Sequence, residues 1–201
     1  EMLHKIEVSE YQDMDQARKL IYEAIVQYRR MKNTGVVAIF EKDRFDKYSY
    51  FARIGEGSMG GKGRGLAFMG HIAKKHQELS EYKNLQVTIP KTVVLCTDIF
   101  DEFMETNKLY SMALSNIPDE DILKHFLAAK LPERLVDDFL VFFKAVNNPI
   151  AVRSSSLLED SHYQPFAGIF STYMIPNVED ESEMIRMVSD AIKAVYASVF
   201  Y

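Results

Sequence analysis

Apolar residues recur every three or four positions in several parts of the chain, which is the spacing of an amphipathic helix. The expected helices span 13–32, 66–79, 119–130, 132–146 and 178–201, and another follows Thr97 or Asp98, either of which can cap it, and ends near Asn107. Short apolar runs typical of strands lie at 36–40, 48–54, 92–96, 150–152 and 169–175. Because strands alternate with helices, the pattern predicts an α/β domain.

The most glycine-dense stretch is GEGSMGGKGRG at 55–65, directly before one of the expected helices. The N-terminus of a helix attracts anions, and Lys62 would add a mobile positive charge there. The stretch is not a Walker A loop, because Gly63 stands where that motif has Ser or Thr. Spacing alone leaves a second interpretation open, in which this is a flexible loop with a solvated lysine.

A second candidate site begins where the apolar run 150–152 ends at Arg153. Three serines follow at 154–156, then the acidic pair Glu159-Asp160, then Pro165-Phe166-Ala167-Gly168, and a second expected strand carries Thr172. A guanidinium, a row of hydroxyls and a glycine between two strands are a plausible cradle for an oxyanion. The alternative is a surface pair of arginine and acid beside a polar turn.

Three blocks of residues, taken in order, resemble the nucleotide-binding domain of the phosphoenolpyruvate synthase and pyruvate phosphate dikinase family. The first is GGKG at 60–63 with GLA at 65–67, and the second is IPKTVV at 89–94 followed by Thr97, Phe100 and Phe103. The third is AVRSS at 151–155, then the acidic pair, FAG at 166–168 and Thr172. The blocks cover roughly residue 55 to the end of the chain.

The resemblance implies an ATP-grasp-like nucleotide-binding region, with a mixed sheet flanked by helices, that we expect to be incomplete at its C-terminus. Residues 1–54 would then be an N-terminal helix and strand pair, serving as a linker or as the start of the domain. Residues 55–201 would be the first part of the ATP-binding domain of a larger multidomain enzyme.

The resemblance also implies a reaction, in which ATP phosphorylates a histidine on a separate swivelling domain that passes the phosphate to pyruvate. Lys62 and Arg153 would be the catalytic cations and, with Gly168 and Thr172, would bind the phosphates in one shared cleft. Ser154 and Ser155 would hold their loop in shape, while Glu159 and Asp160 would orient Arg153 or face water. We expect the loop 156–165 to be less ordered than its flanking strands without nucleotide.

The implied cofactors are ATP and Mg²⁺, with the metal ligands outside this chain, and pyruvate or phosphoenolpyruvate would bind through other domains. We expect a homodimer in the full-length protein and no turnover by this chain alone. Two alternatives stay open. One is the same ATP domain in a phosphotransferase with a glucan or antibiotic acceptor, and the other is a non-catalytic nucleotide-binding regulatory module.

Composition narrows the functional class further. A net charge of −5 argues against a general nucleic-acid-binding protein. The one cysteine, Cys96, excludes an internal disulfide, favours a cytoplasmic setting and reads as a packed thiol at the end of a strand. There is no apolar run of membrane-spanning length, and the five histidines lack partners at ligand spacing, so we predict neither a membrane span nor a histidine metal site.

Overall fold

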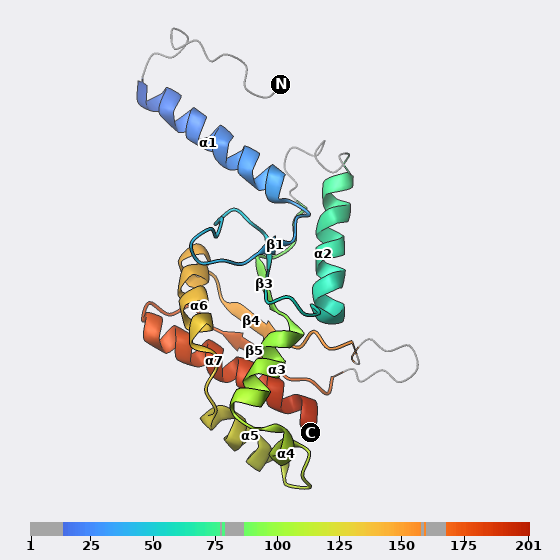
Figure 1. The fold of residues 1–201 in the computed structure, drawn as a ribbon. Coiled ribbons are helices and arrows are strands. Elements are labelled where there is room, and N and C mark those ends of the chain that lie inside the picture. Colours follow the sequence, from blue (N-terminus) through green and yellow to red (C-terminus); the bar gives the residue numbers. More distant parts are fainter. Residues whose placement is uncertain (1–13, 77, 79–86, 158, 160–167) are drawn as a thin grey trace.

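The structure is a computed structural model that describes residues 14–76, 78, 87–157, 159 and 168–201 (Figure 1). Helices and strands alternate along much of the chain, which confirms the predicted α/β class. In chain order the elements are α1 (Met14–Asn33), β1 (Ala38–Ile39), β2 (Phe51–Ile54), α2 (Gly60–Lys75), β3 (Thr92–Leu95), α3 (Thr97–Thr106), α4 (Tyr110–Ala113), α5 (Asp119–Ala128), α6 (Glu133–Ala145), β4 (Ile150–Arg153), β5 (Thr172–Ile175), α7 (Glu181–Ala197) and the short 3₁₀ turn η3 (Ser198–Phe200).

The described strands form two sheets rather than the one mixed sheet expected from the sequence. Strands β1, β2 and β3 pair in parallel and in that order, so that Phe51 lies opposite Thr92 and Ile54 opposite Leu95. Strands β4 and β5 form a separate antiparallel pair. Because the three parallel strands run the same way, the connections that follow β2 and β3 begin at the same edge of the sheet.

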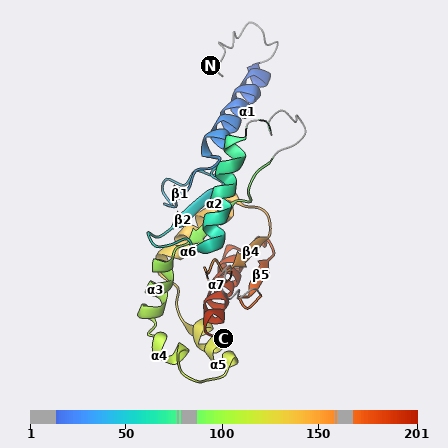
Figure 2. The ribbon, with the colours of Figure 1, turned by 90° about the vertical axis from the view of Figure 1, so that its right-hand side faces the viewer.

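Two apolar clusters hold these layers together. The larger one packs the three-stranded sheet and β5 against α3, α6 and α7, and its buried members include Phe40, Ile54, Ile99, Leu135, Phe139, Phe142, Ile175, Met184 and Val188. The smaller one joins α3, α4 and α5 to the end of α7 through residues such as Phe103, Leu109, Ile122 and Phe126. Figure 2 shows these helices gathered at one end of the molecule, with α1 and α2 at the other. The phenylalanines therefore serve the core, as their spacing predicts.

Helix α1 has the predicted bounds within one residue, but its apolar face is not buried by the described part of the chain. The helix projects away from both sheets (Figures 1 and 2). Of its apolar residues only Ala17 is buried, at 7% exposure. Five residues of its apolar stripe keep 41 to 50% of their surface exposed: Leu20, Ile21, Ile25, Tyr28 and Met31. Periodicity thus identified the helix, but the described residues leave most of its apolar face exposed.

Helix α2 begins at Gly60, six residues before the predicted start at Leu66. Its buried residues are glycines, namely Gly60, Gly63 and Gly70, rather than the larger apolar residues of the expected face. A Cβ on Gly70 would lie 3.1 Å from Cδ1 of Ile89, so the missing side chain lets the helix approach this segment closely.

One further element differs from the prediction. The short helix α4 was not foreseen, since a single helical turn carries almost no periodic signal. No helix among the described residues is long and apolar enough to cross a membrane.

Candidate functional site

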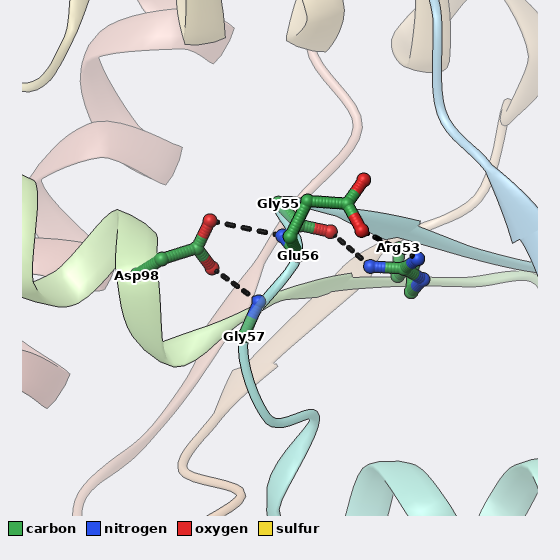
Figure 3. Close-up of polar contacts among 5 residues, drawn as sticks. All are labelled: Arg53, Gly55, Glu56, Gly57 and Asp98. Carbon is green, nitrogen blue, oxygen red and sulfur yellow. Dashed lines mark hydrogen bonds and ion pairs between the residues drawn. The ribbon is translucent and has the colours of Figure 1, made fainter.

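The turn that joins β2 to α2 is held in place by a carboxylate at the start of α3. The backbone N–H groups of Glu56 and Gly57 both donate to the Asp98 carboxylate, each at 2.9 Å (Figure 3). On the other side of the turn, the Arg53 guanidinium donates to the carbonyl of Gly55 and pairs with the Glu56 carboxylate at 3.1 Å. Gly55, with a φ of +97°, supplies the left-handed conformation that the turn needs.

Thr97 binds the same turn from the adjacent position. Its hydroxyl accepts the N–H of Ser58 at 3.0 Å, and its own N–H donates to the Ser58 carbonyl at 3.0 Å. The prediction that Thr97 or Asp98 is the N-cap of α3 is wrong, because Cys96 occupies the cap position and makes no side-chain cap bond. The side chains of Thr97 and Asp98 bind instead to the turn 55–58, which is called the glycine turn below.

The pKa of Asp98 lies below its ordinary value. Partial burial works to raise it, but the N–H groups of Glu56 and Gly57, together with those at the start of α3, stabilise the charged form more strongly. The carboxylate is therefore ionised at neutral pH. A fixed negative charge here holds the turn, and it lies on the side of the turn where α3 begins.

Ser155 fastens the start of α2 to the end of β4. Its carbonyl accepts the N–H of Gly61 at 2.9 Å, and its hydroxyl oxygen accepts the N–H of Gly63 at 2.8 Å. The same hydroxyl donates to the carbonyl of Met59 at 2.7 Å. A Cβ on Gly60 would lie 1.7 Å from the Ser155 carbonyl oxygen, so no larger residue fits at that position. The predicted role of Ser155 in holding the loop is confirmed.

These contacts change the expected anion site at the helix start. The N–H groups of Gly61 and Gly63 are engaged by Ser155, and that of Gly60 donates to the Ser58 hydroxyl at 3.2 Å. The expectation that the glycine-rich helix start offers these amides to an anion is therefore wrong. Positive charge at this site comes from side chains instead.

Lys62, in the first turn of α2, forms an ion pair with Glu159. The facing atoms, Nζ and Oε2, are both buried from solvent, and the two side chains are 27% and 16% exposed. Sequence reasoning expected Glu159 to orient Arg153 or to face water and missed this pairing. Asp160, the second acid of the pair, lies outside the described residues. So does most of the loop 156–165, which we expected to be less ordered than its flanking strands.

Arg153 and Thr172 are brought together by the register of β4 and β5, in which they are direct partners. Along β4 half-buried and exposed residues alternate, so the strand predicted to be buried has one solvent face, and Arg153 lies on it. Thr172 is also exposed. Within the described residues the Arg153 side chain makes no hydrogen bond or ion pair, which leaves its guanidinium available.

Gly168 lies on the approach to β5, four positions before Thr172. It is exposed and has a φ of +82°, and a Cβ there would meet no atom within 4 Å. No contact within the described residues joins it to Lys62 or Arg153, and its neighbours Phe166 and Ala167 lie outside the described residues. No cluster of three or more acidic, histidine or cysteine side chains that could hold a metal ion occurs in the described ranges.

Cys96 is a packed thiol, as its position at the end of an apolar strand predicts. It follows β3 directly and is 1% exposed. Burial raises the pKa of the thiol, and the nearby Arg53 guanidinium offsets only part of this rise. The thiol is therefore protonated at neutral pH and is a poor nucleophile.

Comparison with models of known protein families identifies the family of this chain. The model of the pyruvate phosphate dikinase AMP/ATP-binding domain matches residues 56–201. The chain belongs to this family. The match confirms the resemblance seen in the sequence, and it includes Lys62, Arg153, Gly168 and Thr172. No curated protein and no solved structure was found to match the chain.

As a pyruvate phosphate dikinase AMP/ATP-binding domain, the matched segment is an ATP-binding domain of a dikinase-type phosphotransferase family. The match begins at Glu56, inside the glycine turn, and covers α2 and every later element. Helix α1 and strands β1 and β2 precede it, although both strands belong to the same sheet as β3.

Proposed function

We propose that this domain binds ATP for a phosphoenolpyruvate synthase-like dikinase, in which a histidine carrier takes a phosphate from ATP and passes it to pyruvate. The observation that supports this best is the contact of Ser155 with Gly61 and Gly63. It fastens the helix that carries Lys62 to the strand that ends in Arg153, so two cations far apart in sequence belong to neighbouring segments.

Lys62 and Arg153 have the principal roles in this proposal. Phosphoryl transfer depends mainly on positioning and on neutralising the charge of the phosphates. The Arg153 guanidinium would bind phosphate oxygens in bidentate fashion, and the Lys62 ammonium would act as a point charge after leaving Glu159. We propose further contacts from the Thr172 hydroxyl, directly opposite Arg153, and from the Gly168 N–H.

The available groups fit the phosphates of a nucleotide, because the donor set combines two cations with a hydroxyl on an exposed strand face. ATP supplies the phosphate that is transferred, whereas the residues of this chain bind and orient it. We also propose that the fold is ATP-grasp-like and that the Mg²⁺ ligands lie outside this chain. Of the two roles expected for residues 1–54, we propose that they are the start of the ATP-binding domain, because β1 and β2 pair in the same sheet as β3. Finally, we propose that the full-length protein is a homodimeric, cytoplasmic enzyme that needs its other domains for turnover.

Nucleotide binding by charge-neutralising variants tests the site. We expect Lys62→Gln and Arg153→Gln each to weaken ATP binding by about tenfold, measured by titration calorimetry, because each removes a charged phosphate contact. Lys74→Gln is the matched control, since Lys74 is an exposed cation in the last turn of the same helix. Unchanged ATP affinity in both site variants would contradict the assignment of these residues.

The reaction itself is tested with the full-length protein. Pyruvate-dependent formation of AMP from ATP is expected, and Arg153→Gln is expected to abolish most of it. ATP binding without AMP formation in the presence of pyruvate would rule out the dikinase reaction. It would leave the other-acceptor phosphotransferase and the regulatory module as the remaining interpretations.

A further inference from the structure

A cationic cavity lies at the end of the three-stranded sheet opposite to the glycine turn. Its volume is about 260 Å³, and it is lined by Arg30, Lys47, Tyr48, Tyr50, Lys91, Lys144 and Ala145. Tyr50 directly precedes β2 and Lys91 directly precedes β3, whereas the glycine turn and Thr97 follow these strands. Because the strands are parallel and four residues long, the cavity and the glycine turn are about 13 Å apart along the sheet.

The lining of this cavity carries four cations and no carboxylate. Two acids, Asp46 and Glu181, interact with residues of this lining. Asp46 accepts the side-chain N–H of Asn33 at 2.8 Å and the Tyr48 N–H at 2.9 Å, and Glu181 lies 3.8 Å from Lys144. Glu181 is an ion-pair partner of Lys144, whereas Arg30, Lys47 and Lys91 form no ion pair with a described residue. These three cations repel one another, and an anion that enters the cavity relieves the repulsion.

Lys91 shows this imbalance most clearly. Its ammonium donates to the Lys47 carbonyl and lies 5.7 Å from the centre of the Phe45 ring, but it forms no ion pair with a described residue. Burial lowers the pKa of Lys91, and the charge of Arg30 lowers it further, against the opposing effect of Asp46. An anion in the cavity would compensate a charge for which the described residues provide no ion-pair partner.

The shape and chemistry of the cavity select a class of ligand. Its volume falls just below the range of drug-sized ligand sites, which favours a small molecule over a whole nucleoside triphosphate. Arginine and lysine together suit the oxygens of phosphate, and the two tyrosines add hydroxyl groups at the wall. We propose that this cavity binds a small phosphate-bearing anion at a site separate from the glycine turn.

The position of the cavity gives such a ligand a structural role. Arg30, in α1, and Lys47, in the connection to β2, precede the segment that matches the family, whereas Lys91 and Lys144 lie within it. A bound anion would therefore join the N-terminal segment to the family domain through shared charge contacts. This inference does not depend on where ATP binds.

Thermal unfolding and titration calorimetry of the chain test the proposal. Inorganic phosphate, pyrophosphate and glycerol 3-phosphate are compared with chloride at constant ionic strength. We expect at least one of the three phosphate compounds to bind and to raise the Tm. The compound that binds most tightly shows whether the ligand is a free phosphate, a diphosphate or a phosphate ester. Binding no stronger than that of chloride by all three would overturn the proposal.

Matched variants locate the binding. Arg30→Gln and Lys144→Gln alter exposed side chains and are each expected to weaken phosphate binding about tenfold, while Arg18→Gln, on the same helix as Arg30, keeps it. The double variant Lys62→Gln, Arg153→Gln is expected to retain it as well. Equal binding by the two cavity variants and Arg18→Gln, or loss in the double variant, would overturn the assignment to this cavity.

Discussion

Lys62 and Glu159 form an ion pair whose facing atoms are both buried from solvent. The pair occupies the lysine that would otherwise be available to a phosphate group. An incoming anion must therefore compete with a carboxylate, which makes Glu159 a determinant of how strongly the proposed site attracts nucleotide.

Neutralising Glu159 is expected to strengthen ATP binding. In Glu159→Gln the carboxylate no longer competes for the Lys62 ammonium, and we expect the Kd for ATP to fall about tenfold. Glu56→Gln is the matched control, because Glu56 is an exposed acid on the nearby glycine turn that pairs with Arg53. Weaker or unchanged ATP binding in Glu159→Gln would show that the acid does not compete with nucleotide.

An amine-specific label separates the ion pair from the proposed role in ATP binding. Without nucleotide, Lys62 is expected to react faster with trinitrobenzenesulfonate in Glu159→Gln than in the unaltered chain, as measured by peptide mass spectrometry. If labelling accelerates but ATP affinity does not change, the ion pair is real and the ATP site is assigned wrongly.

Removing the Ser155 hydroxyl is expected to destabilise the fold. Ser155→Ala loses the bond to the Met59 carbonyl and leaves the Gly63 N–H without its acceptor, at a cost of about 1–3 kcal/mol of unfolding free energy. Ser154→Ala is the control, because the Ser154 hydroxyl accepts only the nearby N–H of Ser156 in the described contacts. Urea unfolding measures both, and equal losses would contradict a special role for Ser155.

Two glycines of α2 should respond oppositely to the same change. Gly60 has a φ of +73°, and its Cβ would collide with the Ser155 carbonyl, so Gly60→Ala is expected to cost more than about 2 kcal/mol. A Cβ on Gly65 meets no atom within 4 Å, so Gly65→Ala should be neutral or stabilising by about 0.5–1 kcal/mol. A Tm for Gly60→Ala at or above that of Gly65→Ala would refute this part of the structure.

The lowered pKa of Asp98 predicts the pH dependence of stability. A carboxylate with a depressed folded pKa stabilises the fold above its ordinary pKa, near 4, and this contribution is lost as the pH falls through the folded pKa. We expect Asp98→Asn to cost about 1–3 kcal/mol at pH 7, since its charged hydrogen bonds to Glu56 and Gly57 are lost.

The difference between the Asp98→Asn variant and the unaltered chain should be constant from pH 7 to about 4 and should narrow below about pH 4, because the unaltered carboxyl group then becomes neutral as well. Urea midpoints across this range measure the effect. Glu105→Gln, an exposed change on the same helix, should show no such trend. A gap that is constant with pH would mean that Asp98 does not hold the turn through its charge.

Much of the architecture could be predicted because it rests on local pattern. Apolar spacing located α1, α5, α6 and α7, whose bounds depend on residues close in sequence. The start of α2 was missed because glycine is a poor helix former, and the contacts of Gly61 and Gly63 with Ser155 are distant in sequence. Periodicity likewise revealed the apolar stripe of α1 but carries no information about what covers it.

The site was predictable as a set of residue types rather than as a set of contacts. The motifs pointed to Lys62 and Arg153, and register places Arg153 opposite Thr172. The pairing of Lys62 with Glu159 and the hold of Asp98 on the glycine turn were missed. Both join residues distant in sequence, and a single sequence offers no signal for such contacts. The functional roles of these residues stay predictions.

The contacts of Ser155 have a consequence for how the chain folds. Its hydroxyl joins residues 92 and 96 positions away, and closing so long a segment costs chain entropy that local helices do not incur. Contacts of large sequence separation slow folding and tend to follow local structure. The segments that carry Lys62 and Arg153 would therefore meet late, so a chain with its helices formed still lacks the proposed site until the final association of its two sheets.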